Sequence, residues 1–110
     1  MKNILELNFK SLTQGEEILS GKIEILGRNL TTIKRAGGVI WFEFNSICSG
    51  PRSFQDYIEI SKEFHTIFVS KIPLLSSNRD NETRRFIALV DECYERNVNL
   101  LLSSDGEIKK

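Results

Sequence analysis

The sequence predicts a single α/β domain: a β-meander, then a helix, then a βαβ unit, all sharing one mixed sheet. Three observations lead to this fold class. The length of 110 residues allows one core. Three β-rich runs separated by turn signals lie between residues 21 and 44, which is the pattern of a meander. An amphipathic helix stands between two short apolar runs over residues 66–102, and this order is typical of parallel strands joined by a crossover.

The net charge and the length of the apolar runs argue against binding to nucleic acid or to a membrane. The chain has 15 Lys and Arg against 15 Asp and Glu, so it offers no excess positive charge for nucleic acid or an anionic membrane. Its apolar runs are far shorter than the roughly 20 residues that span a bilayer. The first residues lack the apolar stretch of a secretory signal, so we expect an intracellular chain with no nucleic-acid partner and no membrane span.

The N-terminal half divides into a short helix and the meander. Mixed apolar spacing over residues 3–12 predicts a helix, and we assign residues 1–14 to an N-terminal helix or linker and 15–104 to the α/β domain. In the last β-rich run, residues 39–44, alternate positions are apolar on one face and mostly apolar on the other. We therefore expect a central strand that is covered on both sides.

The C-terminal half is predicted to alternate helix and strand. Ser53 and Asp56 have the spacing of a capping box and open a helix that ends near His65. A buried strand over residues 66–70 and a second buried strand over 98–102 enclose a helix from about Glu82 to Arg96. The apolar stripe of that helix comprises Phe86, Leu89, Val90, Cys93 and Tyr94. We expect residues 105–110 to form a disordered tail.

Two segments imitate nucleotide-binding motifs without meeting their requirements. Between Gly15 and Gly21 there are five residues where a phosphate loop needs four, and Ile23 follows Lys22 where Ser or Thr would hold magnesium. The run from Phe86 to Glu92 looks like an apolar strand ending in Asp-Glu, but helical periodicity continues through it. We therefore assign Asp91 and Glu92 to the polar side of a helix and predict no cofactor-binding residue.

The sequence predicts no catalytic residue and no metal ligand either. His65 is the sole histidine, and a zinc site built with Cys48 and Cys93 would need distant positions to converge and a fourth ligand. Neither cysteine has a context that would activate it as a nucleophile, so both are expected to be reduced thiols in the core.

Arg84 and Arg85 are the candidate site residues. They lie near a predicted helix start, where cations are unfavourable beside the positive end of the helix dipole. Two explanations stay open: a structural ion pair with a carboxylate such as Asp56 or Asp91, or contact with a phosphate or a partner. Tyr57 is assigned to the core.

An ordered set of motifs carries a family resemblance. The set is Gly27-Arg28, Phe42-Glu43-Phe44 with Ile47-Cys48, Asp56-Tyr57-Ile58-Glu59-Ile60, Phe64-His65-Thr66-Ile67-Phe68 with Ile72-Pro73, Arg84-Arg85-Phe86-Ile87 with Leu89-Val90-Asp91-Glu92 and Tyr94, and Val98 through Ser103. Over residues 21–104 the chain resembles the C-terminal part of the ZapE/Afg-one-like ATPases. It departs from them at Lys71, where an acidic residue is usual, and at Asn99, where lysine is usual.

The resemblance implies a P-loop ATPase of AAA+ type, whose bacterial members act in cell division and whose mitochondrial members act in protein quality control. ATP and magnesium are implied for the full-length family, whose phosphate loop, Asp-Glu strand and sensor residues lie N-terminal to the matching region. The chain alone is expected to be inactive. Implied partners are the missing N-terminal ATPase core, other subunits of the same protein and cell-division proteins, in the bacterial cytoplasm or, for a eukaryotic relative, in mitochondria.

We accordingly expect a domain of such an ATPase that serves assembly or partner recognition. The alternative is a free-standing intracellular interaction module with no nucleotide role, using a surface formed by Trp41 and Phe54. An independent enzyme is the least favoured hypothesis because no nucleophile, base and orienting group come together in the sequence.

Overall fold

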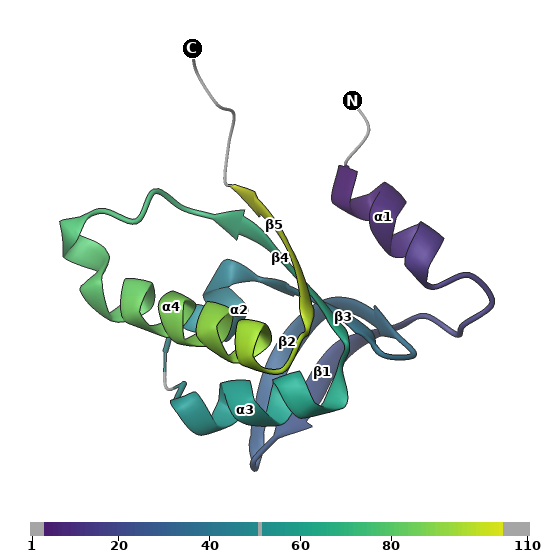
Figure 1. Ribbon diagram of the computed structural model, residues 1–110, viewed down its shortest axis with the longest axis horizontal. Helices are drawn as coiled ribbons and strands as arrows, with labels where there is room; N and C mark the ends of the chain where they lie inside the picture. The colour runs from purple at the N-terminus through teal and green to yellow at the C-terminus, as the bar shows by residue number, and fades with distance from the viewer. Residues whose placement is uncertain (1–3, 51, 105–110) are drawn as a thin grey trace.

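Five strands form one mixed sheet whose order in space, β1-β2-β3-β4-β5, repeats their order in the chain. The computed structural model describes residues 4–50 and 52–104 (Figure 1). The elements are α1 (Ile4–Leu12), β1 (Leu19–Ile25), β2 (Arg28–Ala36), β3 (Val39–Glu43), α2 (Phe44–Cys48), α3 (Phe54–Glu63), β4 (Thr66–Ile72), a 3₁₀ turn η1 (Ser77–Arg79), α4 (Asp80–Glu95) and β5 (Asn99–Ser104).

The strand pairing confirms the predicted meander and βαβ unit. β1 pairs with β2, and β2 with β3, in antiparallel fashion. β3 pairs with β4, and β4 with β5, in parallel fashion. Helices α2 and α3 therefore form a first crossover between parallel strands, and α4 forms the second, so the parallel half of the sheet consists of two successive βαβ units.

The helices divide unequally between the two faces of the sheet. α2, α3 and α4 cover one face (Figure 1), where their buried side chains share an apolar cluster with Ile40, Phe42 and Ile67. α1 covers the other face through Leu5 and Phe9. Both faces of β3 are consequently buried, as its sequence predicts.

Three aromatic rings fix α1 on its face of the sheet. The ring of Phe9 lies 5.8 Å from that of Trp41 and 5.5 Å from that of Phe68, measured between centroids. These are contact distances for tilted and edge-to-face pairs, which add to the apolar area that they bury. Lys34 on β2 also pairs with Glu6 on α1 at 2.8 Å. The predicted N-terminal helix is thus an integral part of the fold.

The capping box at the start of α3 is confirmed. Ser53 is the N-cap, and its backbone N–H donates to the Asp56 carboxylate at 2.9 Å. Asp56 also accepts two contacts from Arg28 Nη2, at 2.8 Å and 3.0 Å. The start of β2 is thereby tied to the start of α3.

The structure differs from the sequence prediction at β3 and α2. Phe44, predicted to end the central strand, is instead the first residue of α2, a helix of five residues that the alternating pattern does not reveal. Its side chain is fully buried in either assignment. Because a short helix and a strand bury a single apolar residue equally well, periodicity alone does not separate them here.

Two further predictions are corrected at the C-terminal end. β5 is the edge strand of the sheet and is only partly buried, because no strand of the described residues covers its outer side. Tyr94, predicted on the core stripe of α4, is 84% exposed. The stripe itself is present, with Leu89 and Cys93 buried. The predicted tail 105–110 lies outside the described residues.

Candidate functional site

The candidate site is the outer surface where α4 meets the loop between α2 and α3. A cavity of about 330 Å³ opens there between Arg52, Ser53, Phe54, Asn81, Arg84 and Arg85. We call Arg52, Arg84 and Arg85 the arginine face. The first comes from the loop between α2 and α3, and the other two come from α4.

Two of these arginines are fixed by backbone carbonyl groups. Arg85 Nη1 donates to the carbonyl oxygen of Cys48 at 3.3 Å, and Arg52 Nε donates to the carbonyl oxygen of Ser46 at 2.9 Å. Both acceptors belong to α2, a short helix whose last carbonyl groups lack intrahelical partners. The two guanidinium groups thus provide hydrogen bonds to carbonyl groups of α2.

Arg84 is exposed and forms no ion pair with any residue that the structure describes. It lines both the cavity above and a neighbouring apolar groove of about 340 Å³, formed by Phe54, Arg84, Ile87, Ala88, Asp91 and Glu92. Phe54 is 63% and Ile87 53% exposed. Exposed aromatic and aliphatic side chains beside arginine are characteristic of protein interfaces.

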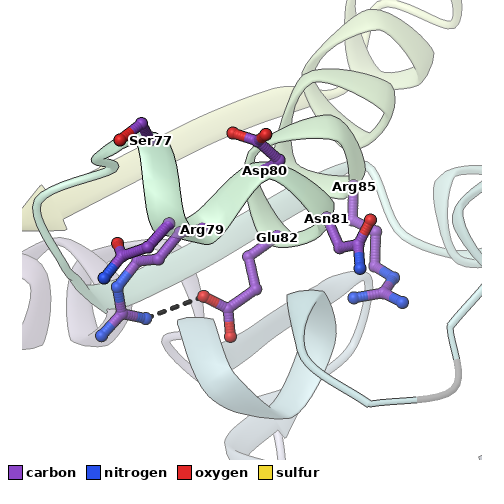
Figure 2. Close-up of a pocket in the computed structure, with 7 residues that line it drawn as sticks. Ser77, Arg79, Asp80, Asn81, Glu82 and Arg85 are labelled. Carbon is purple, nitrogen blue, oxygen red and sulfur yellow. Dashed lines mark hydrogen bonds and ion pairs between the residues drawn. The ribbon is translucent and has the colours of Figure 1, made fainter.

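A second, larger cavity of about 570 Å³ lies on the other side of Arg85, around the start of α4. Figure 2 shows Arg79 and Glu82 pointing toward each other there, joined by an ion pair of 2.7 Å. Glu82 also accepts a hydrogen bond from the Ser49 hydroxyl. These two hydrogen bonds, from Ser49 first and then Arg79, lower the pKa of Glu82 below its usual value.

Neither of the carboxylates predicted to pair with Arg84 or Arg85 forms such an ion pair among the described residues. Asp56 is fully buried and pairs with Arg28. Asp91 lines the apolar groove with Arg84 but forms no ion pair within residues 4–50 and 52–104. The sequence does not reveal Arg28 as the partner, because residues 28 and 56 meet only through the tertiary fold.

The helix-dipole argument for Arg84 and Arg85 is weaker in the structure than in the sequence. α4 begins at Asp80 rather than near Glu82, which places both arginines in its second turn. The first turn carries Asp80 and Glu82, whose charges suit the positive end of the dipole. Position along the helix therefore does not explain these arginines.

The residues present do not fit a nucleotide. Residues 15–18 lead into β1, and Lys22 lies within that strand, whereas a phosphate loop connects a strand to the start of a helix. Asp91 and Glu92 lie on α4 rather than at a strand end. Both parallel crossovers also cover the same face, so the carboxyl ends of the strands have no topological switch point.

The two cysteines lie in the core, whereas the histidine lies at the surface. Cys48 and Cys93 are free and buried, and burial raises the pKa of Cys48 to about 12 and that of Cys93 to about 11. His65 is exposed, with Nδ1 2.8 Å from the Thr66 hydroxyl. In the described part of the chain, no three His, Cys, Asp or Glu side chains are arranged to hold a metal ion.

The expected surface of Trp41 and Phe54 does not exist. Trp41 is 2% exposed beneath α1, and its Nε1 donates to the Ser70 hydroxyl at 2.9 Å. Phe54 lies with α3 on the opposite face of the sheet. Arg52 lines the cavity with Arg84 and Arg85, although the sequence analysis does not predict it as a site residue. The sequence signal for it is its position directly before Ser53, the N-cap of α3.

Within the described residues, no helix is long and apolar enough to cross a membrane.

Comparison with known proteins gives consistent matches. The model of the AFG1-like ATPase family matches residues 1–110. The cell division protein ZapE of Escherichia coli K12 is 38% identical over 95 residues, which are 86% of this chain and 25% of that protein. An uncharacterized protein of Schizosaccharomyces pombe is 34% identical over 89 residues, 81% of this chain and 20% of its own length. Lactation elevated protein 1 homolog B of Danio rerio is 26% identical over 88 residues, 80% of this chain and 18% of its own length.

The chain thus spans about a fifth to a quarter of the length of these relatives. No solved structure matches it.

Proposed function

Since this chain belongs to the AFG1-like ATPase family, we propose that it is an assembly and partner-recognition part of such an ATPase, packing on a nucleotide-binding core supplied by the rest of the protein. In the complete protein, that core would bind ATP and magnesium. The resemblance to ZapE favours a bacterial cytoplasmic setting and a role linked to cell division.

The observation that carries the proposal is the arginine face beside its apolar groove. Arg84 is exposed and without an ion pair among the described residues, while Phe54 and Ile87 expose apolar surface next to it. An exposed guanidinium recognises a carboxylate or a phosphate with two parallel hydrogen bonds. An apolar groove at the same place adds affinity through burial.

This combination suits contact with an acidic surface of the core or of a neighbouring subunit. Arg85, fixed to the Cys48 carbonyl group, would position the start of α4, and Arg84 would make the direct contact. If the neighbouring surface carries a bound nucleotide, its phosphates offer the same chemistry. The arginine face would then link nucleotide state to assembly.

The test substitutes arginine in a complete AFG1-like ATPase that contains this segment. Arg84→Ala and Arg85→Ala are each expected to lower the ATPase rate or to weaken oligomerisation, measured by phosphate release and by sedimentation velocity. Lys62→Ala is the control, because Lys62 is an exposed cation on α3 that pairs with Glu59, and neither residue lines the arginine face or its groove. Unchanged rate and assembly in both test variants would contradict the proposal.

A second experiment addresses this chain by itself. Titration calorimetry with ATP and magnesium is expected to give no saturable heat, because the chain has no phosphate loop. Saturable binding that Arg84→Ala and Arg85→Ala abolish would mean that the arginine face is itself a phosphate site, and the nucleotide-binding role would have to be assigned to this domain.

A further inference from the structure

The two edges of the sheet differ in how well they are protected against pairing with another strand. β1, at one edge, carries Lys22 and Glu24, and its pairing with β2 is irregular between Leu19 and Gly21. Charged side chains and irregular pairing are the usual means by which natural sheets discourage a further strand. β1 is therefore a protected edge.

β5, at the other edge, carries no charged side chain, although its pairing with β4 is also irregular at one point, between Val69 and Ile72. Its six residues, Asn99–Ser104, include no charged residue and no proline. Their pairing with β4 is regular from Asn99 to Leu102. On the outer side of β5 no strand of residues 4–50 and 52–104 is paired, so this edge presents free backbone N–H and C=O groups.

The side chains of β5 are also those of an internal strand. Leu100 packs against the cluster beneath α2, α3 and α4, and Leu101 packs against the cluster beneath α1. Leu102 shares the face of Leu100 by strand alternation and is 44% exposed. Leucines on both faces of a parallel strand are expected where a sheet continues, not where it stops.

We propose that β5 pairs with β5 of a second copy of this chain, extending the sheet across a two-fold axis. The strand is compatible with itself in antiparallel orientation. An axis at Leu101 places that residue opposite its own copy on the α1 face, and places Leu100 opposite Leu102 of the second copy on the other face.

No like charges meet in this arrangement, and the exposed Leu102 becomes a cross-strand neighbour of an apolar residue. The interface is isologous and closes at two copies. Pairing along six residues buries less than the about 1,200 Å² typical of stable complexes, so we expect a weak dimer that forms at high protein concentration. This surface is separate from the arginine face, so its test does not depend on the proposed function.

The experiment is sedimentation equilibrium of the 110-residue chain from micromolar to millimolar concentration. The dissociation constant is expected to rise by about tenfold in Leu102→Lys, because a charge at the edge opposes pairing. Leu26→Lys is the matched control: Leu26 is 52% exposed in the turn before β2, at the opposite edge, and its substitution is expected to leave the dimer unchanged.

Hydrogen exchange of the unsubstituted chain provides a second readout that needs no variant. Amides of residues 99–104 are expected to exchange more slowly as concentration rises, while those of β1 do not change. A chain that stays monomeric at millimolar concentration would overturn the proposal and leave the edge for a strand from a different protein. A dimer that both lysine variants weaken equally, or neither weakens, would also overturn it.

Discussion

Removing the Asp56 carboxylate tests how the fold is held together at the start of α3. Asp56 is fully buried and accepts the Ser53 backbone N–H at 2.9 Å and Arg28 Nη2 at 2.8 Å. Asp56→Ala removes both interactions at once. We expect it to lower the free energy of unfolding by about 3 kcal/mol, the sum of a lost helix cap and a lost charge-assisted hydrogen bond.

The loss expected for Asp56→Ala combines the helix cap and the hydrogen bond with Arg28, which contribute unequally. Loss of a capping side chain costs about 1 kcal/mol. The hydrogen bond with Arg28 falls within about 1.5–3 kcal/mol, and we take about 2 because the Arg28 side chain is 41% exposed and solvent screens its charge. Arg28→Ala leaves the cap in place and should therefore cost about 2 kcal/mol, mainly because it leaves a buried carboxylate without its cation.

The assay is urea unfolding followed by far-UV circular dichroism, arranged as a double-mutant cycle. The Arg28–Asp56 coupling energy should be about 1.5–2 kcal/mol, whereas Arg85 and Asp56 should be additive. The exposed pair of Glu59 and Lys62, 3.7 Å apart, is a control with an expected coupling below about 0.5 kcal/mol. A coupling for Arg28 and Asp56 no larger than that control would refute the reasoning.

Three other predictions follow from packing and titration. Phe9→Ala should cost about 3–5 kcal/mol by opening a cavity under α1, and the emission of the buried Trp41 should shift to the red. Cys48 and Cys93 should react with a thiol reagent at about pH 8 only after denaturant is added, because burial raises their pKa values to about 12 and about 11. The pKa of Glu82 is lowered by its hydrogen bonds, so its contribution to stability is complete above the ordinary value of 4.5 and is lost as pH falls below it. Glu82→Gln should flatten that acid-side loss of stability in urea titrations at a series of pH values.

The sequence predicts the parts of the fold that depend on local patterns. The capping box of Ser53 and Asp56, the amphipathic α4 and the turns of the meander are each encoded within a few residues. Strand–helix–strand order then fixes β4 and β5 as parallel, because a crossover of this length permits little else. These are the elements on which prediction and structure agree.

What the sequence leaves undetermined depends on contacts between distant residues. Asp56 has several candidate arginines, and only the packing of the β1–β2 hairpin against α3 selects Arg28. Trp41 is apolar and large, but its burial depends on α1 crossing the sheet face. The same holds for Tyr94, whose helical spacing matches the core stripe although its ring lies in solvent.

The candidate site is less predictable than the fold. The sequence predicts Arg84 and Arg85 from their position, but the cavity that they line also needs Arg52 from the α2–α3 loop and Phe54 from the start of α3, about 30 residues earlier. Local sequence patterns predict the helix that carries the candidate site. The other side chains of the site come from elements that are distant in the sequence and pack beside that helix.

The agreement between strand order and chain order has a consequence for synthesis. Because each strand pairs with the one made just before it, a chain emerging from the ribosome can complete the sheet one strand at a time, without waiting for a later segment to insert between earlier ones. Within this segment, α1 precedes the strands in the chain, yet it packs against Trp41 and Phe68 and beside β5, so its contacts are completed only after β5 is made. Folding of this segment during translation would therefore add strands in chain order, and α1 would reach its complete set of contacts only after the last strand has formed.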